Sequence, residues 1–181
     1  MASDCLEGIH SKLSEDIFDV VDETDQVIGK NRRSVVHEGH LCHRAVHILL
    51  SNKAGQIFLQ KRSASKDTNP NRWDSSCSGH VDSGEIYDQA AVRELEEELG
   101  ICIPIEKLEK IRKFQATRET GMEFVWVYFG RHEGPFVLNL AEISDGRYWD
   151  LEEVDRGIAS RRDDFSGAFR FIWPQVRSLL L

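Results

Sequence analysis

Apolar and polar positions alternate over short runs in the first part of the chain, and turn residues separate the runs. Residues 17–22 and 27–29 are apolar and β-branched around an acidic turn, which predicts a β-hairpin. Residues 44–50 and 56–61 are similar runs on either side of the turn-prone segment 52–55, and they predict a second hairpin. The N-terminal part of the fold is therefore expected to be β-sheet.

The periodicity becomes helical after a short extended segment at residues 73–81. Within residues 86–99 an apolar stripe recurs at helical spacing, and it consists of Ala91, Val92, Leu95 and Leu99. Gly100 follows directly and predicts the end of the helix, because glycine tolerates the left-handed conformation that ends many helices.

Two more strands and two more helices are predicted in the C-terminal half. Residues 108–116 and 122–130 have strand-like composition. Residues 151–161 and 169–181 have helical spacing, although Pro174 interrupts the second of these segments. Strands, a central helix, further strands and terminal helices together predict an α/β fold, an α/β/α sandwich around a mixed β-sheet.

The composition predicts one globular domain at residues 16–181, preceded by a loose tail at residues 1–15. The chain has 181 residues, of which 40% are hydrophobic and 30% charged, and it contains no repeat or Pro/Gly-rich linker. No stretch approaches the roughly 18 apolar residues that a membrane helix needs, and the tail is unlike a signal peptide. The four cysteines are widely spaced, so neither a disulfide framework nor a cysteine zinc site is indicated. We expect a cytoplasmic protein with no membrane partner.

Charge is distributed unevenly along the chain. The net charge of −8 argues against a nucleic-acid duplex as the partner, because duplex binding relies on excess Lys and Arg. Residues 27–75 nevertheless carry nine Lys or Arg against three acids. This asymmetry suits a site where an acidic cluster holds metal and a basic wall meets phosphates, although an ordinary solvated surface would look the same. The candidate substrate-binding residues are Arg44, Lys61, Arg62 and His80.

Three glutamates, Glu94, Glu97 and Glu98, stand at i, i+3 and i+4 of the predicted central helix and therefore project from one face. Three like charges so close together repel each other, so we expect a cation on this face. Carboxylate oxygens select Mg²⁺ or Mn²⁺, and Mg²⁺ is commonly shared between a few carboxylates and substrate phosphates. The helix is a candidate metal site.

The residues around these glutamates follow fixed offsets. Arg93 is placed to reach both Glu97 and Glu85, so it would hold carboxylates in place. Gly79 and Gly84 precede Glu85 and let the loop bring backbone groups near the metal. A charge run is more often a solvated helix face. Seven fixed residues at fixed offsets, however, have a chance probability on the order of 10⁻⁹ per start position.

Residues 79–101 read G-x5-E-x7-R-E-L-x-E-E-x-G-I and resemble the Nudix box at every defining position. Residues 42–46 (CHRAV), 60–63 (QKRS) and 73–84 (WDSSCSGHVDSG) are most similar to Nudix proteins related to isopentenyl-diphosphate isomerase. The resemblance implies the Nudix fold and a Mg²⁺- or Mn²⁺-dependent hydrolase. Its substrate would be a small-molecule diphosphate, either a nucleoside diphosphate derivative or a related organic diphosphate.

The resemblance also implies roles for individual residues. Bound cations would neutralise the diphosphate, and a carboxylate would position or deprotonate the attacking water. Glu94 or Glu98 would serve as that carboxylate, as would Glu119 or Glu123 outside the box, and of these last two we place Glu123 first. The catalytic set is then Arg93, Glu94, Glu98 and Glu123, the metal site Gly79, Glu94, Glu97 and Glu98, and the supporting set Gly84, Glu85 and Gly100.

The related isomerases move a double bond instead, using a cysteine directly before a Gly-His pair. In this chain the residue before Gly79 and His80 is Ser78, and Cys77 stands one position too early. A shift of one residue in extended backbone turns a side chain to the opposite face, so Cys77 is not expected to substitute. The isomerase is therefore the second hypothesis and hydrolysis the first.

Histidines keep the isomerase hypothesis open. His43, His80 and Glu123 align with isomerase metal ligands, and His37 or His40 would complete a cluster. A third hypothesis, an inactive Nudix fold used as a binding module, predicts loss of the motif glutamates, yet all are present. The sequence does not identify the substrate, and it leaves a homodimer open.

Overall fold

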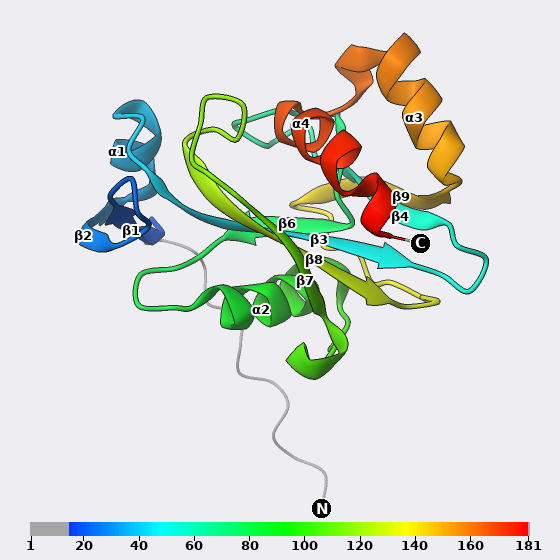
Figure 1. The fold of residues 1–181 in the computed structure, drawn as a ribbon, viewed down its shortest axis with the longest axis horizontal. Coiled ribbons are helices and arrows are strands. Elements are labelled where there is room, and N and C mark those ends of the chain that lie inside the picture. The colour runs from blue at the N-terminus through cyan, green and yellow to red at the C-terminus, as the bar shows by residue number, and fades with distance from the viewer. Residues whose placement is uncertain (1–14, 181) are drawn as a thin grey trace, which may run out of the picture.

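The computed structural model describes residues 15–180 and shows a mixed β-sheet with helices on both faces. Helix α2 (Tyr87–Leu99) lies below the sheet in Figure 1, and helices α3 (Leu151–Ser160) and α4 (Gly167–Val176) lie above it. The predicted α/β fold with a mixed sheet is confirmed. The predicted tail lies outside the described residues, except for Glu15.

The main sheet has seven strands in the order β5-β4-β3-β8-β7, with β6 also paired to β3 and β9 to β4. Strands β3 and β8 run parallel over their whole length, and the other pairings are antiparallel. The strands are β3 (His43–Ser51), β4 (Ile57–Arg62), β5 (Trp73–Asp74), β6 (Cys77–His80), β7 (Glu109–Phe114), β8 (Glu123–Arg131) and β9 (Ile143–Trp149).

A small subdomain precedes the main sheet. Strands β1 (Ile17–Val21) and β2 (Val27–Arg32) form the predicted first hairpin, and the short helix α1 (Arg33–Glu38) follows it. The three elements lie together beside the N-terminal end of β3, at the left of Figure 1. Phe18 of β1 is buried against the main body.

Strands β3 and β4 separate soon after their hairpin turn. They pair only at Leu50 with Phe58 and at Ser51 with Ile57. Farther from the turn β3 pairs with β6, and β4 pairs with β5. The segment from β5 to β6 therefore crosses from one strand to the other, and the divergence places side chains of both strands around a common space.

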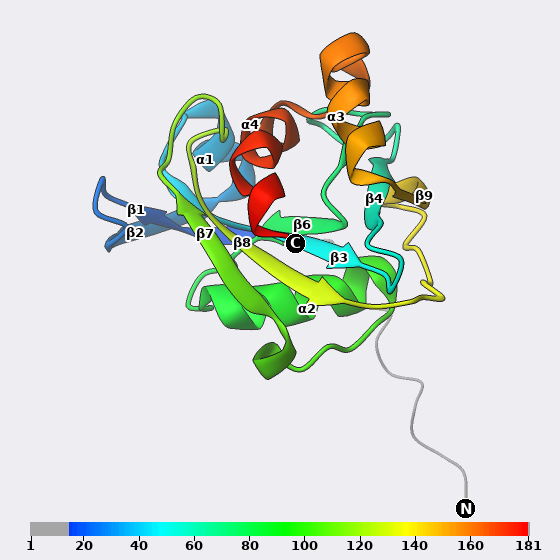
Figure 2. The same cartoon turned by 45° about the vertical axis from the view of Figure 1, so that its right-hand side comes forward.

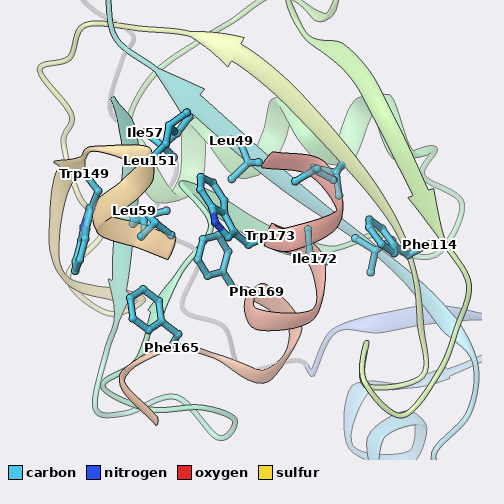
Figure 3. Packing of buried hydrophobic residues seen from close by; sticks show 14 of the residues in the cluster. Leu49, Ile57, Leu59, Phe114, Trp149, Leu151, Phe165, Phe169, Ile172 and Trp173 are labelled. Carbon is cyan, nitrogen blue, oxygen red and sulfur yellow. The ribbon is translucent and has the colours of Figure 1, made fainter. Parts of the chain in front are cut away.

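Two buried clusters lie on the two faces of the sheet, because alternate residues of a strand point to opposite faces. From β3, Ala45 and Leu49 pack toward α3 and α4, whereas Val46 and Ile48 pack toward α2. Figure 3 shows the first cluster, in which aromatic rings of α4 and its flanking loop meet aliphatic residues of β3 and β4; its labelled aromatic residues are Phe114, Trp149, Phe165, Phe169 and Trp173.

Helix α2 begins and ends as its sequence predicts. Its buried positions include Ala91, Leu95 and Leu99, three residues of the predicted stripe. Gly100 ends it in the left-handed conformation with φ 63°. In the view of Figure 2 the helix runs under the sheet, with its N-terminal end near β6 and β1.

Several elements differ from the prediction. Helix α1 and strand β9 are additional to the predicted elements, as are three short 3₁₀ helices, η1 (Ile105–Lys107), η2 (Arg162–Asp164) and η3 (Arg177–Leu179). Helix α4 runs from Gly167 to Val176 rather than over residues 169–181. Ser166 caps α4 by accepting a hydrogen bond from the Phe169 N–H at 3.1 Å, and Pro174 lies inside its last turn. Among the helices of residues 15–180, none is long and apolar enough to cross a membrane.

Candidate active site

A cleft of about 900 Å³ opens where strands β3 and β4 diverge. Its walls come from β3, β6, helix α2 and two loops, residues 65–69 and 118–121. The cleft brings together most of the residues that the sequence predicts for the site, and these are Arg62, Gly79, His80, Arg93, Glu94, Glu97, Glu98 and Glu123.

Gly79 lets a glutamate of helix α2 reach this cleft past strand β6. A Cβ atom at Gly79 would lie 2.0 Å from the carboxylate of Glu94, which is far inside van der Waals contact. Any residue with a side chain would therefore displace Glu94. The first glycine of the motif is explained by this close approach.

Glu94 and Glu98 are two buried carboxylates one helical turn apart. Their residues are 9% and 4% exposed. Glu98 Oε2 accepts hydrogen bonds from Gln60 Nε2 at 3.0 Å and from the Ser78 N–H at 3.2 Å. Burial raises the pKa of Glu94 to about 8 and also raises the pKa of Glu98.

This pair fits a hard divalent cation. Two buried acids side by side are unfavourable as anions unless a cation compensates them, and neighbouring carboxylate oxygens are the ligands that Mg²⁺ and Mn²⁺ prefer. Glu97 is less well placed as a metal ligand than Glu94 and Glu98, because its side chain is 54% exposed and is bonded to Arg93. The structure therefore gives the predicted metal site two inward glutamates and one at its rim.

Arg93 connects the carboxylates of the motif. Its Nε and Nη2 donate to the two carboxylate oxygens of Glu85 at 3.0 and 2.8 Å, and its Nη1 donates to Glu94 at 2.7 Å and to Glu97 at 3.2 Å. Nη2 also donates to the His80 carbonyl at 2.9 Å. Arg93 thus holds the loop, the strand and the helix in register, which makes it a positioning residue.

A second set of metal-ligand side chains lies beside the cleft. His37, His43, His80 and Glu123 offer ligand atoms that all lie within 4.8 Å of one another, and no other such group occurs within residues 15–180. His37 rather than His40 completes the cluster that the sequence suggests. Burial, with repulsion from neighbouring cations, lowers the pKa of His37 to about 4, so its ring is neutral near pH 7.

The proton positions in this cluster leave one nitrogen without a partner. Arg33 donates to His80 Nδ1 at 3.2 Å, so neutral His80 carries its proton on Nε2 and donates to Glu123 at 3.1 Å. His43 Nδ1 lies 2.9 Å from the Leu41 carbonyl, to which it must donate.

His43 Nε2 faces Glu123 Oε1 at 3.5 Å, and it has no hydrogen bond in the described part of the chain. A cation could be ligated by both of these atoms. The three nitrogens and one oxygen suit a first-row transition metal better than Mg²⁺.

The structure places the predicted basic residues in different surroundings. Arg62 and His80 line the cleft, whereas Arg44 and Lys61 do not. Arg44 instead binds the buried Asp25 through Nε at 2.6 Å, and the Lys61 ammonium lies over the ring of Trp73.

Ser78 and Cys77 point to opposite faces of strand β6, as their one-residue offset predicts. Ser78 pairs with His47 beside the cleft, whereas Cys77 pairs with Ile48 and is fully buried in the cluster against α2. Burial and the neighbouring Glu98 raise the pKa of the Cys77 thiol well above its usual value. Cys77 is therefore a packed, protonated thiol.

A family model for the NUDIX domain matches residues 42–169. The chain belongs to the Nudix hydrolase family. Isopentenyl-diphosphate Delta-isomerase 2 of Photorhabdus laumondii is 30% identical over 160 residues, which are 87% of this chain and 90% of that protein. An uncharacterized Nudix hydrolase of Yersinia pestis is 36% identical over 150 residues, 82% of this chain and 78% of its own.

A solved structure supports the same assignment. The crystal structure of DR0079 from Deinococcus radiodurans has a TM-score of 0.77 and 29% sequence identity, and the match covers 88% of this chain and 98% of that one. The predicted membership of a Nudix branch that resembles isopentenyl-diphosphate isomerase is confirmed, because relatives of both names match most of the chain.

Sequence reasoning missed several residues of the cleft. Lys66, Arg33 and Arg118 line it and supply cations that the motif does not predict. Lys66 is paired with Glu142, and Arg33 is paired with Asp67. His47 and Asp74 line the inner end and are both nearly buried. The only signal for them in the sequence was the basic bias of residues 27–75, which does not distinguish lining residues from surface residues.

Proposed function

We propose that this Nudix protein hydrolyses a diphosphate linkage in a small organic diphosphate, with Mg²⁺ or Mn²⁺ bound by Glu94 and Glu98. The observation that carries the proposal is the pair of buried carboxylates, one turn apart, that face the cleft past Gly79. A cation bound there would neutralise phosphate oxygens and lower the pKa of the attacking water. Glu97 at the rim is the third candidate ligand.

Other steps of the reaction would depend on individual side chains near the metal site. Glu98 is held by N–H donors from Gln60 and Ser78, so its carboxylate has a fixed position from which to orient or deprotonate water. Glu123 is hydrogen-bonded to His80 and lies 3.5 Å from His43, which favours a role in the histidine cluster over the role of base. Arg93 would keep the glutamates in place through Glu85.

The basic wall would bind the phosphates. Arg62 lies at the inner end of the cleft, and Lys66 lies on the loop between β4 and β5. Both are close enough to acids to be held in position, Arg62 by Asp74 at 3.6 Å and Lys66 by Glu142. The single-domain organisation, the cytoplasmic location and the homodimer stay predictions.

The histidine cluster favours one alternative, an isomerase acting on an organic diphosphate. The relative in Photorhabdus laumondii has that activity in its name. The cluster of His37, His43, His80 and Glu123 could hold the metal of such an enzyme. Ser78 in the position before Gly79 argues against it, because a hydroxyl is a far weaker acid and nucleophile than a thiol.

A substrate panel separates the hypotheses. The full chain is incubated with Mg²⁺ and, in separate reactions, with nucleoside diphosphates, nucleoside diphosphate sugars and isopentenyl diphosphate. Cleavage of the diphosphate linkage in any of them supports the hydrolase. The products would be inorganic phosphate and a monophosphate from a terminal diphosphate, or a nucleoside monophosphate and a sugar phosphate from a nucleoside diphosphate sugar. Migration of the double bond without phosphate release would instead support the isomerase, and saturable binding without turnover would support a binding module.

A further inference from the structure

His47 lies at the inner end of the cleft and is not part of the Nudix motif or of the histidine cluster. It belongs to strand β3, where its neighbours in register are Ser78 on β6 and Val127 on β8. The residue is 4% exposed, and the part that is exposed lines the cleft. A histidine this deeply buried needs partners for both ring nitrogens.

The hydroxyl of Ser75 determines which nitrogen carries the proton. His47 Nδ1 lies 2.7 Å from Ser75 Oγ. Ser75 is fully buried, and across residues 15–180 its hydroxyl has no other hydrogen-bond partner. A buried hydroxyl must donate its proton to some acceptor, so Ser75 donates to Nδ1. Neutral His47 then carries its own proton on Nε2.

The Nε2–H group is the one polar group of this arrangement without a partner in the described part of the chain. His47 Nε2 is not among the buried side-chain atoms that lack a partner, so this N–H is open to the cleft and available to an acceptor that enters it. Burial also lowers the pKa of His47, which keeps the ring neutral and the single proton in place.

Asp74 and Ser75 hold the imidazole of His47 in place on its Nδ1 side. The Ser75 N–H donates to Asp74 Oδ1 at 2.8 Å, and Asp74 Oδ2 lies 3.6 Å from Arg62 Nη1. Asp74 Oδ1 is also 3.9 Å from His47 Nδ1. Because Asp74 and Ser75 are both buried, the ring has little freedom to turn away from the cleft.

The same region of β6 connects His47 to the proposed metal site. Ser78, which pairs with His47, donates its N–H to Glu98 Oε2 at 3.2 Å. His47 and Glu98 both line this cleft. A diphosphate that bound a cation at Glu98 and extended across the cleft would present an acceptor to His47.

We propose that His47 is a substrate-contacting residue whose Nε2–H donates a hydrogen bond to a non-bridging oxygen of the diphosphate. This rests on the proposed function, since it takes the ligand at Glu98 to be a diphosphate. The bond is charge-assisted on the acceptor side. It needs no change in the charge of the histidine.

The first test observes the imidazole directly. The full chain is labelled with ¹⁵N-histidine, and NMR records the ring nitrogens before and after addition of Mg²⁺ with methylenediphosphonate, a diphosphate analogue that resists hydrolysis. We expect a protonated Nε2 on His47 in the free protein and a shift of that signal with the analogue. Unchanged His47 signals on saturation, or a shift produced fully by Mg²⁺ alone, would overturn the proposal.

The second test uses variants in the hydrolysis assay. His47→Leu removes the donor and should lower kcat/KM on the order of 10-fold or more, whereas His47→Gln keeps an N–H near the same position and should recover part of that loss. Ser75→Ala should lower kcat/KM less than His47→Leu does, because the donor stays but its tautomer is no longer fixed. His132→Gln is the matched control, since His132 lies outside the cleft and, within residues 15–180, its ring accepts a hydrogen bond only from the Gly134 N–H.

The two proposals fail in different ways. Wild-type kcat/KM in folded His47→Leu, with hydrolysis intact, overturns the role of His47 and leaves the hydrolase standing. Absence of hydrolysis across the panel, with a His47 shift on addition of the analogue, overturns the hydrolase and supports His47 as a diphosphate contact. If His47→Leu does not fold, the NMR result on the unmodified chain decides.

Discussion

At the scale of single residues, the close approach of Gly79 and Glu94 explains why the motif begins with a glycine. The absence of a Cβ at Gly79 allows a carboxylate from helix α2 to reach the cleft past strand β6. The buried environment that results raises the pKa of Glu94 and Glu98, and it makes the site favourable for a cation.

Glu98→Gln keeps the size of the side chain and removes its charge. We expect turnover to fall on the order of 10²-fold or more while the protein stays folded, because the cation loses a buried ligand. Initial rates of substrate cleavage at saturating Mg²⁺ measure the effect. Glu96→Gln is the matched control, since Glu96 lies on the same helix, is exposed and does not line the cleft.

Gly79→Ala tests the close approach itself. The added methyl group would overlap the Glu94 carboxylate, so either Glu94 leaves the cleft or strand β6 moves. We expect a loss of activity of roughly 10-fold or more, together with a destabilisation of about 1–3 kcal/mol. Urea unfolding and the hydrolysis assay measure the two effects. An alanine variant with the activity and stability of the native chain would show that Glu94 does not need the absence of a side chain at position 79.

The arrangement of residues could be predicted where they stand at fixed spacing on and just before one helix. The structure shows the glutamate face and the Arg93–Glu85 pair, and the roles of these residues stay predictions. His47 could not be predicted, because its partners Asp74 and Ser75 lie at the end of β5 and directly after it. A lone histidine in an apolar run gives no indication that it faces a cleft.

At the scale of elements, the divergence of β3 from β4 creates the space for the site. The sequence predicts this pair as an ordinary hairpin, and only the insertion of β5 and β6 between their far ends shows the opening. Pairings between distant segments leave no mark in local periodicity.

Helix α1 and strand β9 could not be predicted from the sequence, for reasons that lie in their own residues. Helix α1 has only six residues, which is too short to establish a helical period. Strand β9 contains Asp145 and Gly146, residue types depleted in strands, and a Cβ at Gly146 would lie 2.4 Å from the ring of Phe58. Its strand conformation therefore comes from packing on β4 rather than from propensity.

The end of helix α2 offers a prediction about stability. Gly100 has φ 63°, a conformation that costs an ordinary residue about 1 kcal/mol or more, and its α-carbon also faces Val137. Gly100→Ala should lower the free energy of unfolding by about 1–2 kcal/mol with little effect on KM. Urea denaturation measures the change, and an alanine variant as stable as the native chain would contradict the capping role.

The first hairpin is joined to the body by one buried acid. Asp25 binds Arg44, Lys113 and the hydroxyl of Tyr87. Asp25→Asn keeps the shape and tolerates the φ of 63°, but it leaves two cations without their anion.

We expect Asp25→Asn to lower the free energy of unfolding by about 1–3 kcal/mol and to leave KM for the substrate unchanged. Urea unfolding and steady-state kinetics measure both quantities. A marked change in KM without loss of stability would return Arg44 to the list of substrate-binding residues.

At the scale of the whole molecule, acids of helix α2 and cations from the N-terminal half of the chain meet in one cleft. Helix α2 brings the glutamates, and the N-terminal half brings Arg33, Arg62 and Lys66. The uneven charge along the sequence predicted such an arrangement in outline. Which cations face inward depends on the fold, since Arg44 and Lys61 are engaged elsewhere.

Metal-dependent hydrolysis decides whether Glu94 and Glu98 form a catalytic metal site. The chain is freed of metal by chelation, dialysed, and assayed for cleavage of the best substrate of the panel while Mg²⁺ is added back, beside Glu98→Gln and Glu96→Gln. We expect no cleavage without metal, saturable recovery for the native chain and for Glu96→Gln, and almost none for Glu98→Gln. Full hydrolysis by the metal-free chain, or full recovery by Glu98→Gln, would contradict the metal site.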